Sequence, residues 1–232
     1  MPFTFPIQLF QPSQIKPELV ARVIESPDSL SGNSQVIRTD GGGYWRCDMG
    51  GMALLTSDQI RAHRAWEDHM AGGVEQFIVP IADIRHAPRG AVGTQLMRPG
   101  PLLATGSDPY FPEALGYGVP VVIATAGEAE LRATQLSIAV SQGSRIVGGQ
   151  YFSITHTNKG RRMYRTGRVI AQTGQSATVN IVPPLREAIG PATALDFDFP
   201  SFLATLAPNT DTAADLLFAR SANVSFSFRE AF

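Results

Sequence analysis

The residues of this sequence best suited to metal or nucleophilic chemistry are four histidines and one cysteine: His63, His69, His86, His156 and Cys47. A zinc site needs three or four ligands that converge on one point, usually at short and regular spacings. The histidines are scattered and no His-Glu-x-x-His motif is present, so we expect structural roles for them and predict no metal site. A single cysteine also rules out an internal disulfide.

A hydrolase could use an acid and a histidine that orient each other, as Asp83 and His86 could do. No Gly-x-Ser-x-Gly elbow accompanies them, which favours a solvated histidine in a turn. Two carboxylate pairs leave a glycosidase open, because catalytic carboxylates meet only in the folded protein: Glu128 with Glu130, and Asp196 with Asp198. The glycine runs at 41–43, 72–73 and 148–149 match neither a Walker loop nor a dinucleotide-binding fingerprint, so we predict no cofactor.

A further group of residues could bind a ligand without catalysing a reaction. Arg161, Arg162 and Arg165 lie close in sequence to Tyr151 and Tyr164. Such side chains on a small β-barrel could form an oligonucleotide- or oligosaccharide-binding surface. Arginines in turns are also common on surfaces that bind nothing. We therefore predict Arg162, Tyr164 and Arg165 as a candidate ligand surface, with a solvated turn as the simpler alternative.

Three strands joined by short turns must position these side chains. Residues 150–155, 162–171 and 177–182 alternate apolar and polar side chains, as half-buried strands do. Asn158-Lys-Gly160 and Thr173-Gly-Gln175 supply residues that tolerate tight turns. The pattern predicts a meander within a small β-barrel or sandwich.

The composition is that of a globular protein with nearly balanced charge. The chain has 232 residues, 44% hydrophobic and 17% charged, with 19 basic against 20 acidic residues. No basic stripe is present, which argues against a surface that grips nucleic acid but not against a neutral channel for it. No apolar run approaches the ~20 residues of a membrane helix and no signal peptide is visible, so we expect folding in the cytosol and no membrane insertion.

Residues 56–70 form the most clearly predicted helix. Thr56-Ser-Asp-Gln59 is a capping box, and Gly72-Gly73 is expected to end the helix in the left-handed conformation that glycine tolerates. The stripe of this helix that should pack across a sheet consists of Ala62, Ala65, Trp66, His69 and Met70.

The last strand points to a domain inserted within another domain. Residues 223–230 alternate strictly, and a strand at the extreme end of a chain is normally tied into a sheet made elsewhere, here the N-terminal one. The Gly- and Pro-rich stretch 90–117 predicts a boundary followed by a long loop. We therefore predict one domain from residues 1–90 and 196–232, and an inserted domain from residues 91–195.

A series of short motifs follows along the chain: Trp45-Arg-Cys-Asp-Met49, His69-Met-Ala-Gly-Gly73, Phe77-Ile-Val-Pro80, Arg85-His-Ala-Pro-Arg-Gly90, Gly148-Gly-Gln-Tyr-Phe-Ser-Ile154, Arg162-Met-Tyr-Arg165, Pro183-Pro-Leu-Arg186 and Val224-Ser-Phe-Ser-Phe-Arg-Glu-Ala231. In this order they resemble the distal tail (tail-hub) proteins of long-tailed bacteriophages and prophages. The resemblance implies a mainly β fold: a β-sandwich belt domain with one α-helix, closed by the C-terminal strand, and an inserted small β-barrel or sandwich that is OB-like or galectin-like.

The resemblance also implies a structural, non-enzymatic role in the virion tail, after assembly in the host cytoplasm. Such proteins form a ring, expected to be a hexamer, that connects the tail tube protein to the baseplate hub and tail fibre proteins. DNA would pass through its lumen without specific binding. A closed ring needs a heterologous interface, which we predict around the 56–71 helix and its neighbouring strands, with Trp66 and Met70 as candidate contacts. The alternatives are a tail-associated carbohydrate-binding module or glycan hydrolase, and a phage-derived contractile or secretion-system component.

Overall fold

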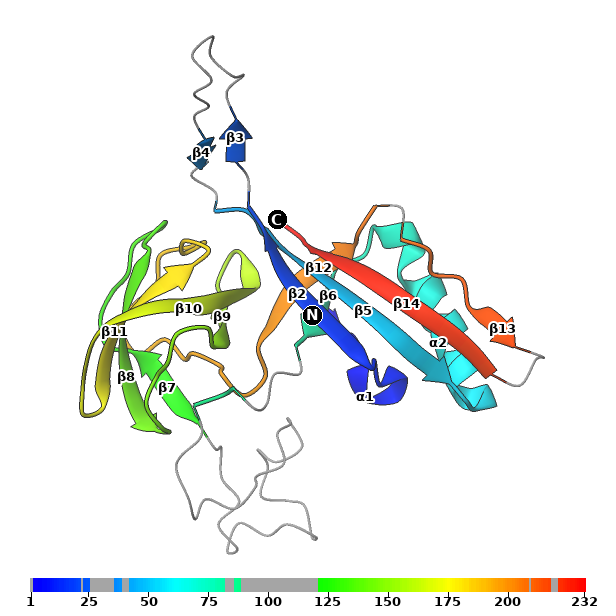
Figure 1. Cartoon of the computed structure of the whole chain (residues 1–232), viewed down its shortest axis with the longest axis horizontal. Coiled ribbons are helices and arrows are strands. Elements are labelled where there is room, and N and C mark those ends of the chain that lie inside the picture. The colour runs from blue at the N-terminus through cyan, green and yellow to red at the C-terminus, as the bar shows by residue number, and fades with distance from the viewer. Residues whose placement is uncertain are drawn as a thin grey trace, which may run out of the picture. The chain divides into compact units, whose positions relative to one another are not determined.

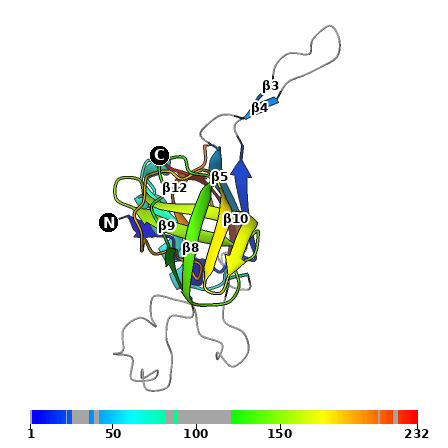
Figure 2. The ribbon, with the colours of Figure 1, turned by 90° about the vertical axis from the view of Figure 1, so that its left-hand side faces the viewer.

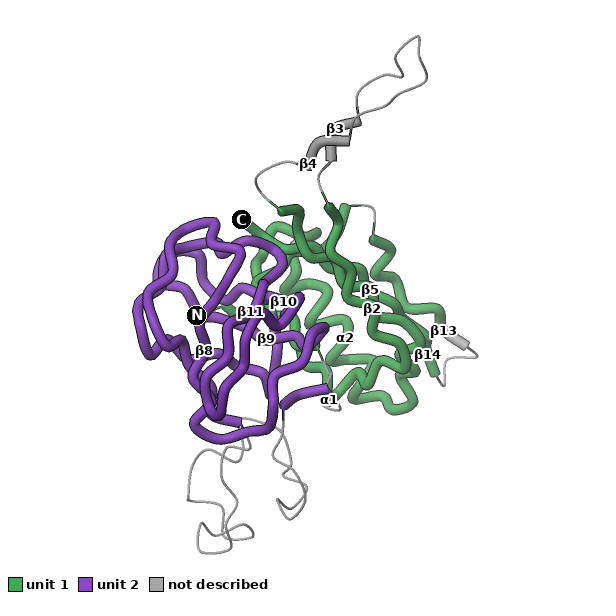
Figure 3. Tube along the Cα trace, turned by 60° about the vertical axis from the view of Figure 1, so that its left-hand side comes forward, with its two compact units in different colours: residues 1–81, 202–232 green, residues 82–201 purple. Residues whose placement is uncertain are grey.

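The fold divides into two compact units. The computed structural model describes residues 2–21, 23–25, 36–38, 42–81, 86–88, 121–208, 210–217 and 221–232. The chain is mainly β, which confirms the predicted fold class. Unit 1 comprises residues 1–81 and 202–232, and unit 2 comprises residues 82–201 (Figure 3). The loop predicted at 90–117 and Asp83 lie outside the described residues, so the loop and the Asp83–His86 pair stay predictions.

Unit 1 is built, within its described residues, on a seven-stranded sheet and a helix (Figure 1). The strands lie in the order β1, β6, β12, β14, β5 and β2, and β13 pairs with β14 beside this path. Their bounds are β1 Phe3–Thr4, β2 Gln14–Val20, β5 Tyr44–Leu54, β6 Phe77–Pro80, β12 Ser201–Leu206, β13 Asp215–Leu217 and β14 Ser221–Glu230. A separate two-stranded sheet consists of β3 (Val23–Glu25) and β4 (Val36–Arg38). The helices are α1 (Ile7–Phe10), α2 (Ser57–His69) and a 3-10 turn, Ala71–Gly73.

The C-terminal strand β14 lies inside the unit 1 sheet, between β12 and β5. It pairs antiparallel with β5, so that Phe228 lies opposite Cys47. On its other side, Glu230 lies opposite Ala204 of β12. The prediction that the last strand completes the N-terminal sheet is therefore confirmed. Because unit 1 draws on both ends of the chain, unit 2 is an insertion into it.

Helix α2 begins and ends where the sequence predicts. Thr56 Oγ1 accepts a hydrogen bond from the Gln59 amide (3.2 Å), and Gln59 Oε1 accepts one from the Thr56 amide (3.1 Å). This reciprocal pair satisfies two amides that the first turn leaves without helical partners. Past the helix, Gly72 and Gly73 have φ angles of 69° and 98°, the left-handed conformation that favours glycine.

The buried face of α2 differs in part from the predicted stripe. Trp66 and Met70 are buried as predicted. Ala65 and His69 are exposed and Ala62 is half-buried, whereas His63 is buried. Positions 63, 66 and 70 are three and four residues apart and therefore share one side of the helix. Phe226 of β14 meets this side, with its ring centroid 4.8 Å from that of Trp66 and 5.6 Å from that of His63.

The core of unit 1 contains a cluster of aromatic rings contributed by α2, the sheet and the N-terminal segment. Neighbouring rings lie 4.8 to 6.3 Å apart between centroids, mostly in edge-to-face contact. The members are Phe5, Phe10, His63, Trp66, Phe77, Phe226 and Phe228. Each such pair adds about 0.5–1.5 kcal/mol beyond the burial of its area. Phe226 contacts most of the others and is 1% exposed, which makes it central to this core.

Replacing Phe226 by alanine should lower the free energy of unfolding of unit 1 by about 3–5 kcal/mol, because it leaves a cavity among large rings. Chemical denaturation followed by tryptophan fluorescence measures this, since Trp66 contacts the removed ring. The control is Asn223→Ala on the exposed side of the same strand, which should change the free energy of unfolding by less than about 0.5 kcal/mol. Equal effects of the two substitutions would contradict this description of the core.

The described part of unit 2 contains a five-stranded antiparallel sheet that curls into a half-barrel (Figures 1 and 2). Its strands are β7 Val122–Thr125, β8 Gln135–Gln142, β9 Tyr151–His156, β10 Gly160–Thr173 and β11 Ser176–Val182, in the order β7, β8, β11, β10, β9. The predicted meander is confirmed as β9, β10 and β11. Apolar side chains from these strands and the segment after them form one core, which includes Leu136, Ile138, Phe152, Val179 and Phe197.

Unit 2 begins earlier than the predicted residue 91. The carbonyl oxygen of His86 accepts a hydrogen bond from the side chain of Gln150 (2.8 Å). The carbonyl oxygen of Pro88 accepts one from the amide of Ser144 (2.8 Å). These contacts tie the segment to unit 2, whose first residue is Ala82.

Unit 2 also ends later than the predicted residue 195, at Ser201. Asp196 and Ser153 exchange two backbone hydrogen bonds of 2.9 Å, and Phe197 packs in the core. Ser153 Oγ donates to the carbonyl oxygen of Ser201 (2.7 Å) and accepts its amide (2.5 Å). The sequence indicates an extended segment here but not the unit with which it pairs, which is why the predicted boundary is wrong.

A close backbone approach in unit 2 explains one of its glycines. A Cβ on Gly148 would lie 2.7 Å from the carbonyl oxygen of Gly167 on β10. We expect Gly148→Ala to destabilise unit 2 by about 1–3 kcal/mol, because backbone must move to relieve the overlap. The matched control is Gly190→Ala, whose Cβ would meet no described atom within 4 Å and should be neutral or slightly stabilising. Thermal unfolding compares the two variants, and equal midpoints would rule out the overlap.

Candidate functional site

The helix side chains predicted to form a subunit interface are buried inside unit 1. Trp66 is 5% exposed and Met70 is 1% exposed. The indole of Trp66 packs against Phe5 and Phe77, with centroids 5.0 and 5.5 Å apart. A side chain that fills the core of its own unit has no surface left for a neighbour. The interface prediction is therefore wrong for both residues.

The predicted Arg/Tyr ligand surface does not form either. Arg162 and Tyr164 are 2% and 0% exposed, and Arg165 is half-buried. Arg162 Nε donates to the carbonyl oxygen of Lys159 at 2.7 Å. A flat strand would expose every second side chain, but β10 is buried on both sides over residues 162–164. The prediction is therefore wrong for Arg162 and Tyr164, and Arg165 keeps part of its surface.

Tyr164 instead joins a buried polar group. Its hydroxyl forms a 2.7 Å hydrogen bond with His156 Nε2, whose direction follows the tautomer of the imidazole. The same oxygen accepts the backbone amide of Arg186 at 3.0 Å. Burial lowers the pKa of His156 to about 4, although the nearby Glu187 carboxylate acts in the opposite direction. The imidazole is therefore neutral at neutral pH and acts as an internal hydrogen-bonding group.

Arg161, the neighbour of the predicted ligand residues, holds the closing segment of unit 2. Its guanidinium forms an ion pair with Asp196 and donates to Ser201 Oγ. It also donates to the carbonyl oxygen of Phe199 at 3.0 Å. The second carboxylate oxygen of Asp196 accepts the amides of Asp198 (3.1 Å) and Phe199 (2.9 Å). Both oxygens of Asp196 are thus occupied, which weakens the glycosidase interpretation of this pair.

Glu187 fixes the turn between β9 and β10. Its carboxylate accepts the backbone amides of Asn158 (3.1 Å) and Lys159 (3.0 Å) and the side-chain amide of Asn158 (2.8 Å). Burial would raise the pKa of Glu187, but these hydrogen bonds outweigh that effect and hold the pKa below its usual value. The result is a structural anion and not an acid poised to give up a proton.

Two other residues of types that can be reactive, Cys47 and His63, are buried in unit 1. Cys47 is 0% exposed, and burial raises the pKa of its thiol to about 12, so the thiol stays protonated and unreactive. His63 is also 0% exposed, and burial lowers its pKa. Its imidazole stacks on Phe226. Both side chains therefore act as core residues of unit 1.

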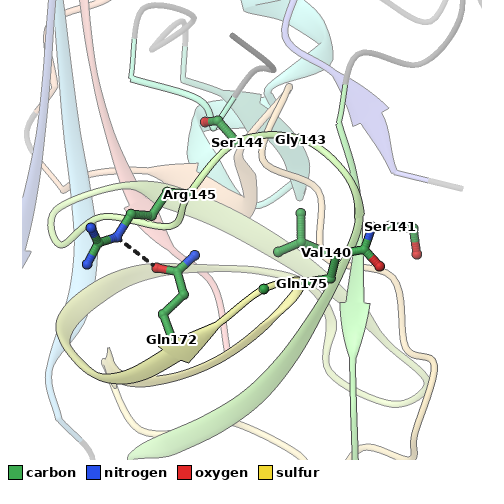
Figure 4. Close-up of a pocket in the computed structure, with 8 residues that line it drawn as sticks. Val140, Ser141, Gly143, Ser144, Arg145, Gln172 and Gln175 are labelled. Atoms are coloured by element: carbon green, nitrogen blue, oxygen red, sulfur yellow. Dashed lines mark hydrogen bonds between the residues drawn. The ribbon is translucent and has the colours of Figure 1, made fainter.

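A polar hollow of about 410 Å³ lies on unit 2 between the segment after β8 and the β10–β11 turn (Figure 4). Arg145 Nε donates to Gln172 Oε1 at 3.3 Å across it. Hydroxyl and amide groups complete the lining, which includes Ser141, Ser144 and Gln175. None of the lining side chains is a carboxylate or histidine, so the hollow supports hydrogen bonding and not acid–base chemistry.

A second hollow, of about 380 Å³, lies on unit 1 over β5, β14 and the segment after β12. Its lining includes Tyr44, Arg46, Asp211, Ser227 and Arg229. Sequence reasoning missed this group. The alternation of residues 44–54 and 221–230 places these side chains on outer faces, but the register that brings the two strands together is a long-range property.

Within the described part of the chain, no group of three or more His, Cys, Asp and Glu side chains is placed to hold a metal ion. Among the same residues, no helix has the length and apolar character needed to cross a membrane. Comparison with protein-family models and with curated proteins finds no match for this chain.

The stability of unit 2 should fall as the pH drops from about 6.5 to about 4. The pKa of His156 is 6.5 in an unfolded chain and about 4 in the folded one, so across that range the unfolded chain binds the proton more strongly. Chemical denaturation at a series of pH values measures the effect in the unsubstituted chain and in His156→Gln. The variant should lack this part of the pH dependence. Parallel curves would show that the imidazole is not held neutral by burial.

Proposed function

We propose that this chain is a structural component of a phage tail, a distal tail protein whose copies close into a ring. The ring would connect the tail tube to the baseplate hub and fibres and leave a lumen for DNA. The observation that carries the proposal is the path of the chain, which leaves unit 1 at Ile81 and returns at Phe202 to end as β14 in the same sheet. An inserted β unit and a closing C-terminal strand are what the resemblance of the motifs implies.

The state of the polar residues supports a role that depends on shape. Cys47 is buried as a thiol, and His156 is buried as a neutral imidazole. Asp196 is held by Arg161 and by backbone amides. These side chains, which from sequence alone are candidates for reactions, are thus part of the internal packing or hydrogen bonding of one unit or the other. A scaffold needs this kind of rigidity.

A ring requires one surface of each subunit to bind a different surface of the next. Exposed large apolar side chains are the expected markers of such surfaces. Leu55 and Val74 flank the two ends of α2 and are 69% and 79% exposed. We therefore place the ring interface at these ends of the helix, in place of the buried Trp66 and Met70.

The net charge of −1 agrees with a lumen through which DNA passes without being held. A surface that grips DNA neutralises several phosphates with lysine and arginine, and its binding slows passage. In this proposal the partners are further copies of the chain, the tail tube protein and the hub and fibre proteins. The protein would act in the virion tail after assembly in the host cytoplasm.

A carbohydrate-binding or glycan-hydrolysing role has weaker support. Arg162 and Tyr164, the expected sugar contacts, are buried. The polar hollow beside Arg145 and Gln172 offers groups that could bind hydroxyls (Figure 4), but none of the side chains that line it is aromatic. Sugar rings usually stack on such a side chain, so this hollow alone does not favour a saccharide.

The ring interface predicts the behaviour of a double variant. Leu55→Glu with Val74→Glu should convert the ring to monomers, because it would place uncompensated charges in an apolar interface. Gel filtration with light scattering and negative-stain images measure the change in assembly. The free energy of unfolding should change by less than about 0.5 kcal/mol, since both side chains are exposed within the subunit.

Leu131→Glu is the matched control, because Leu131 is 57% exposed but belongs to unit 2. It should leave the ring intact. Monomers only, for the unsubstituted chain at high concentration and with the tail tube protein present, would refute the ring. A ring that survives the double variant would refute the placement of its interface.

A further inference from the structure

The outer face of the unit 1 sheet carries two arginines side by side. Arg46 on β5 and Arg229 on β14 lie directly opposite each other in the antiparallel pairing. The adjacent residues Trp45 and Phe228 are both 0% exposed, so the two guanidinium groups lie on the other, solvent-facing side of the sheet. Like charges directly opposite each other destabilise a sheet unless anions compensate them.

The two charges are compensated differently. Arg46 Nε lies 3.1 Å from Asp48 Oδ1, which also accepts the Ser227 hydroxyl at 2.5 Å. The guanidinium carbon of Arg229 lies 4.4 Å from the centre of the Tyr44 ring, a cation–π contact. With the residues that the structure describes, Arg229 forms no ion pair. Among the described residues, the contact of the Arg229 guanidinium is thus with an aromatic ring and not with a carboxylate.

Asp211 and Glu18, two acidic residues on this side of unit 1, form no ion pair with Arg229. Asp211 lines the same hollow, but its Oδ1 accepts the amide of Ala213 at 3.0 Å. Glu18 on β2 lies opposite Arg46 on the side away from β14. Both are exposed to solvent. Arg229 lines the hollow and is half-buried, so its guanidinium is partly accessible to an incoming group.

We propose that this hollow binds a carboxylate from an acidic segment of a partner protein, with Arg229 as its anchor. The planar guanidinium can pair with a carboxylate through two parallel hydrogen bonds, and its contact with the Tyr44 ring limits its freedom to move. This site lies within one subunit, so it does not depend on ring formation.

The dimensions and the remaining polar groups favour an acidic side chain over a saccharide. The volume of about 380 Å³ is near the lower end of small-molecule sites, which run from about 300 to 1,000 Å³. The hydroxyl of Thr210 already donates to the carbonyl oxygen of Ala207 at 2.7 Å, and that of Ser227 donates to Asp48. These two hydroxyl groups are therefore engaged within the subunit, whereas a carboxylate needs only the guanidinium of Arg229.

Calorimetric titration of the full chain with an end-capped hexaglutamate peptide tests the site, with hexaglutamine as the uncharged comparison. Arg229→Gln should weaken binding about tenfold or more, because it removes both the charge and the paired donors. Arg229→Lys keeps the charge and should weaken binding by less. The matched control Arg168→Gln removes an exposed arginine of unit 2 and should bind as the unsubstituted chain does.

Equal affinity of Arg229→Gln and the unsubstituted chain would overturn the proposal, as would the absence of hexaglutamate binding. Binding of inorganic phosphate without binding of the peptide would also overturn it, since the site would then be a phosphate site. If the variants do not fold, NMR of the unsubstituted chain decides. The Arg229 Nε–H resonance should shift with hexaglutamate and not with hexaglutamine, and an unmoved resonance would refute the site.

Discussion

The pairing of β14 with β5 and β12 is the interaction on which the rest of the structure depends. It brings the last residues of the chain into the middle of a sheet whose strands β1, β2, β5 and β6 come from far earlier in the sequence. The entropy cost of closing a chain loop grows only with the logarithm of its length. An inserted unit therefore adds little to that cost. The backbone hydrogen bonds of β14 and the aromatic rings that it adds to the core offset this entropy cost.

The last segment of unit 2 is also fixed by contacts with residues far from it in sequence, before the chain returns to unit 1. Polar side chains perform this role: Arg161 binds Asp196, and Ser153 binds the backbone of Ser201. Buried polar groups are costly unless they are hydrogen-bonded, and the side chains of Arg161, Asp196 and Ser153 all have such partners. In unit 2, Arg161, Asp196 and Glu187 therefore hold strand ends and turns in place.

Two places on the surface of unit 1 differ in character: the ends of α2 and the face around Arg229. In the ring that we propose, the apolar side chains at the ends of α2 would suit a lasting contact between subunits, because burying them removes apolar surface from water. The Arg229 face has the opposite character: it is polar, oriented by an aromatic ring and suited to a single charged group. An assembly protein can combine both kinds of contact, the first for strength and the second for choice of partner.

The sequence by itself determined the local elements: the cap and end of α2, the meander from β9 to β11, and the existence of a C-terminal strand. These depend on hydrogen bonds and alternation within a few residues. It also indicated that this strand joins the N-terminal sheet. Only the tertiary structure decided that Tyr164 and Arg162 are buried, that His63 replaces His69 in the core, and that Asp196 belongs to unit 2. It alone placed Arg46 opposite Arg229. Burial and strand register depend on which distant surfaces meet, and no short stretch of sequence contains that information.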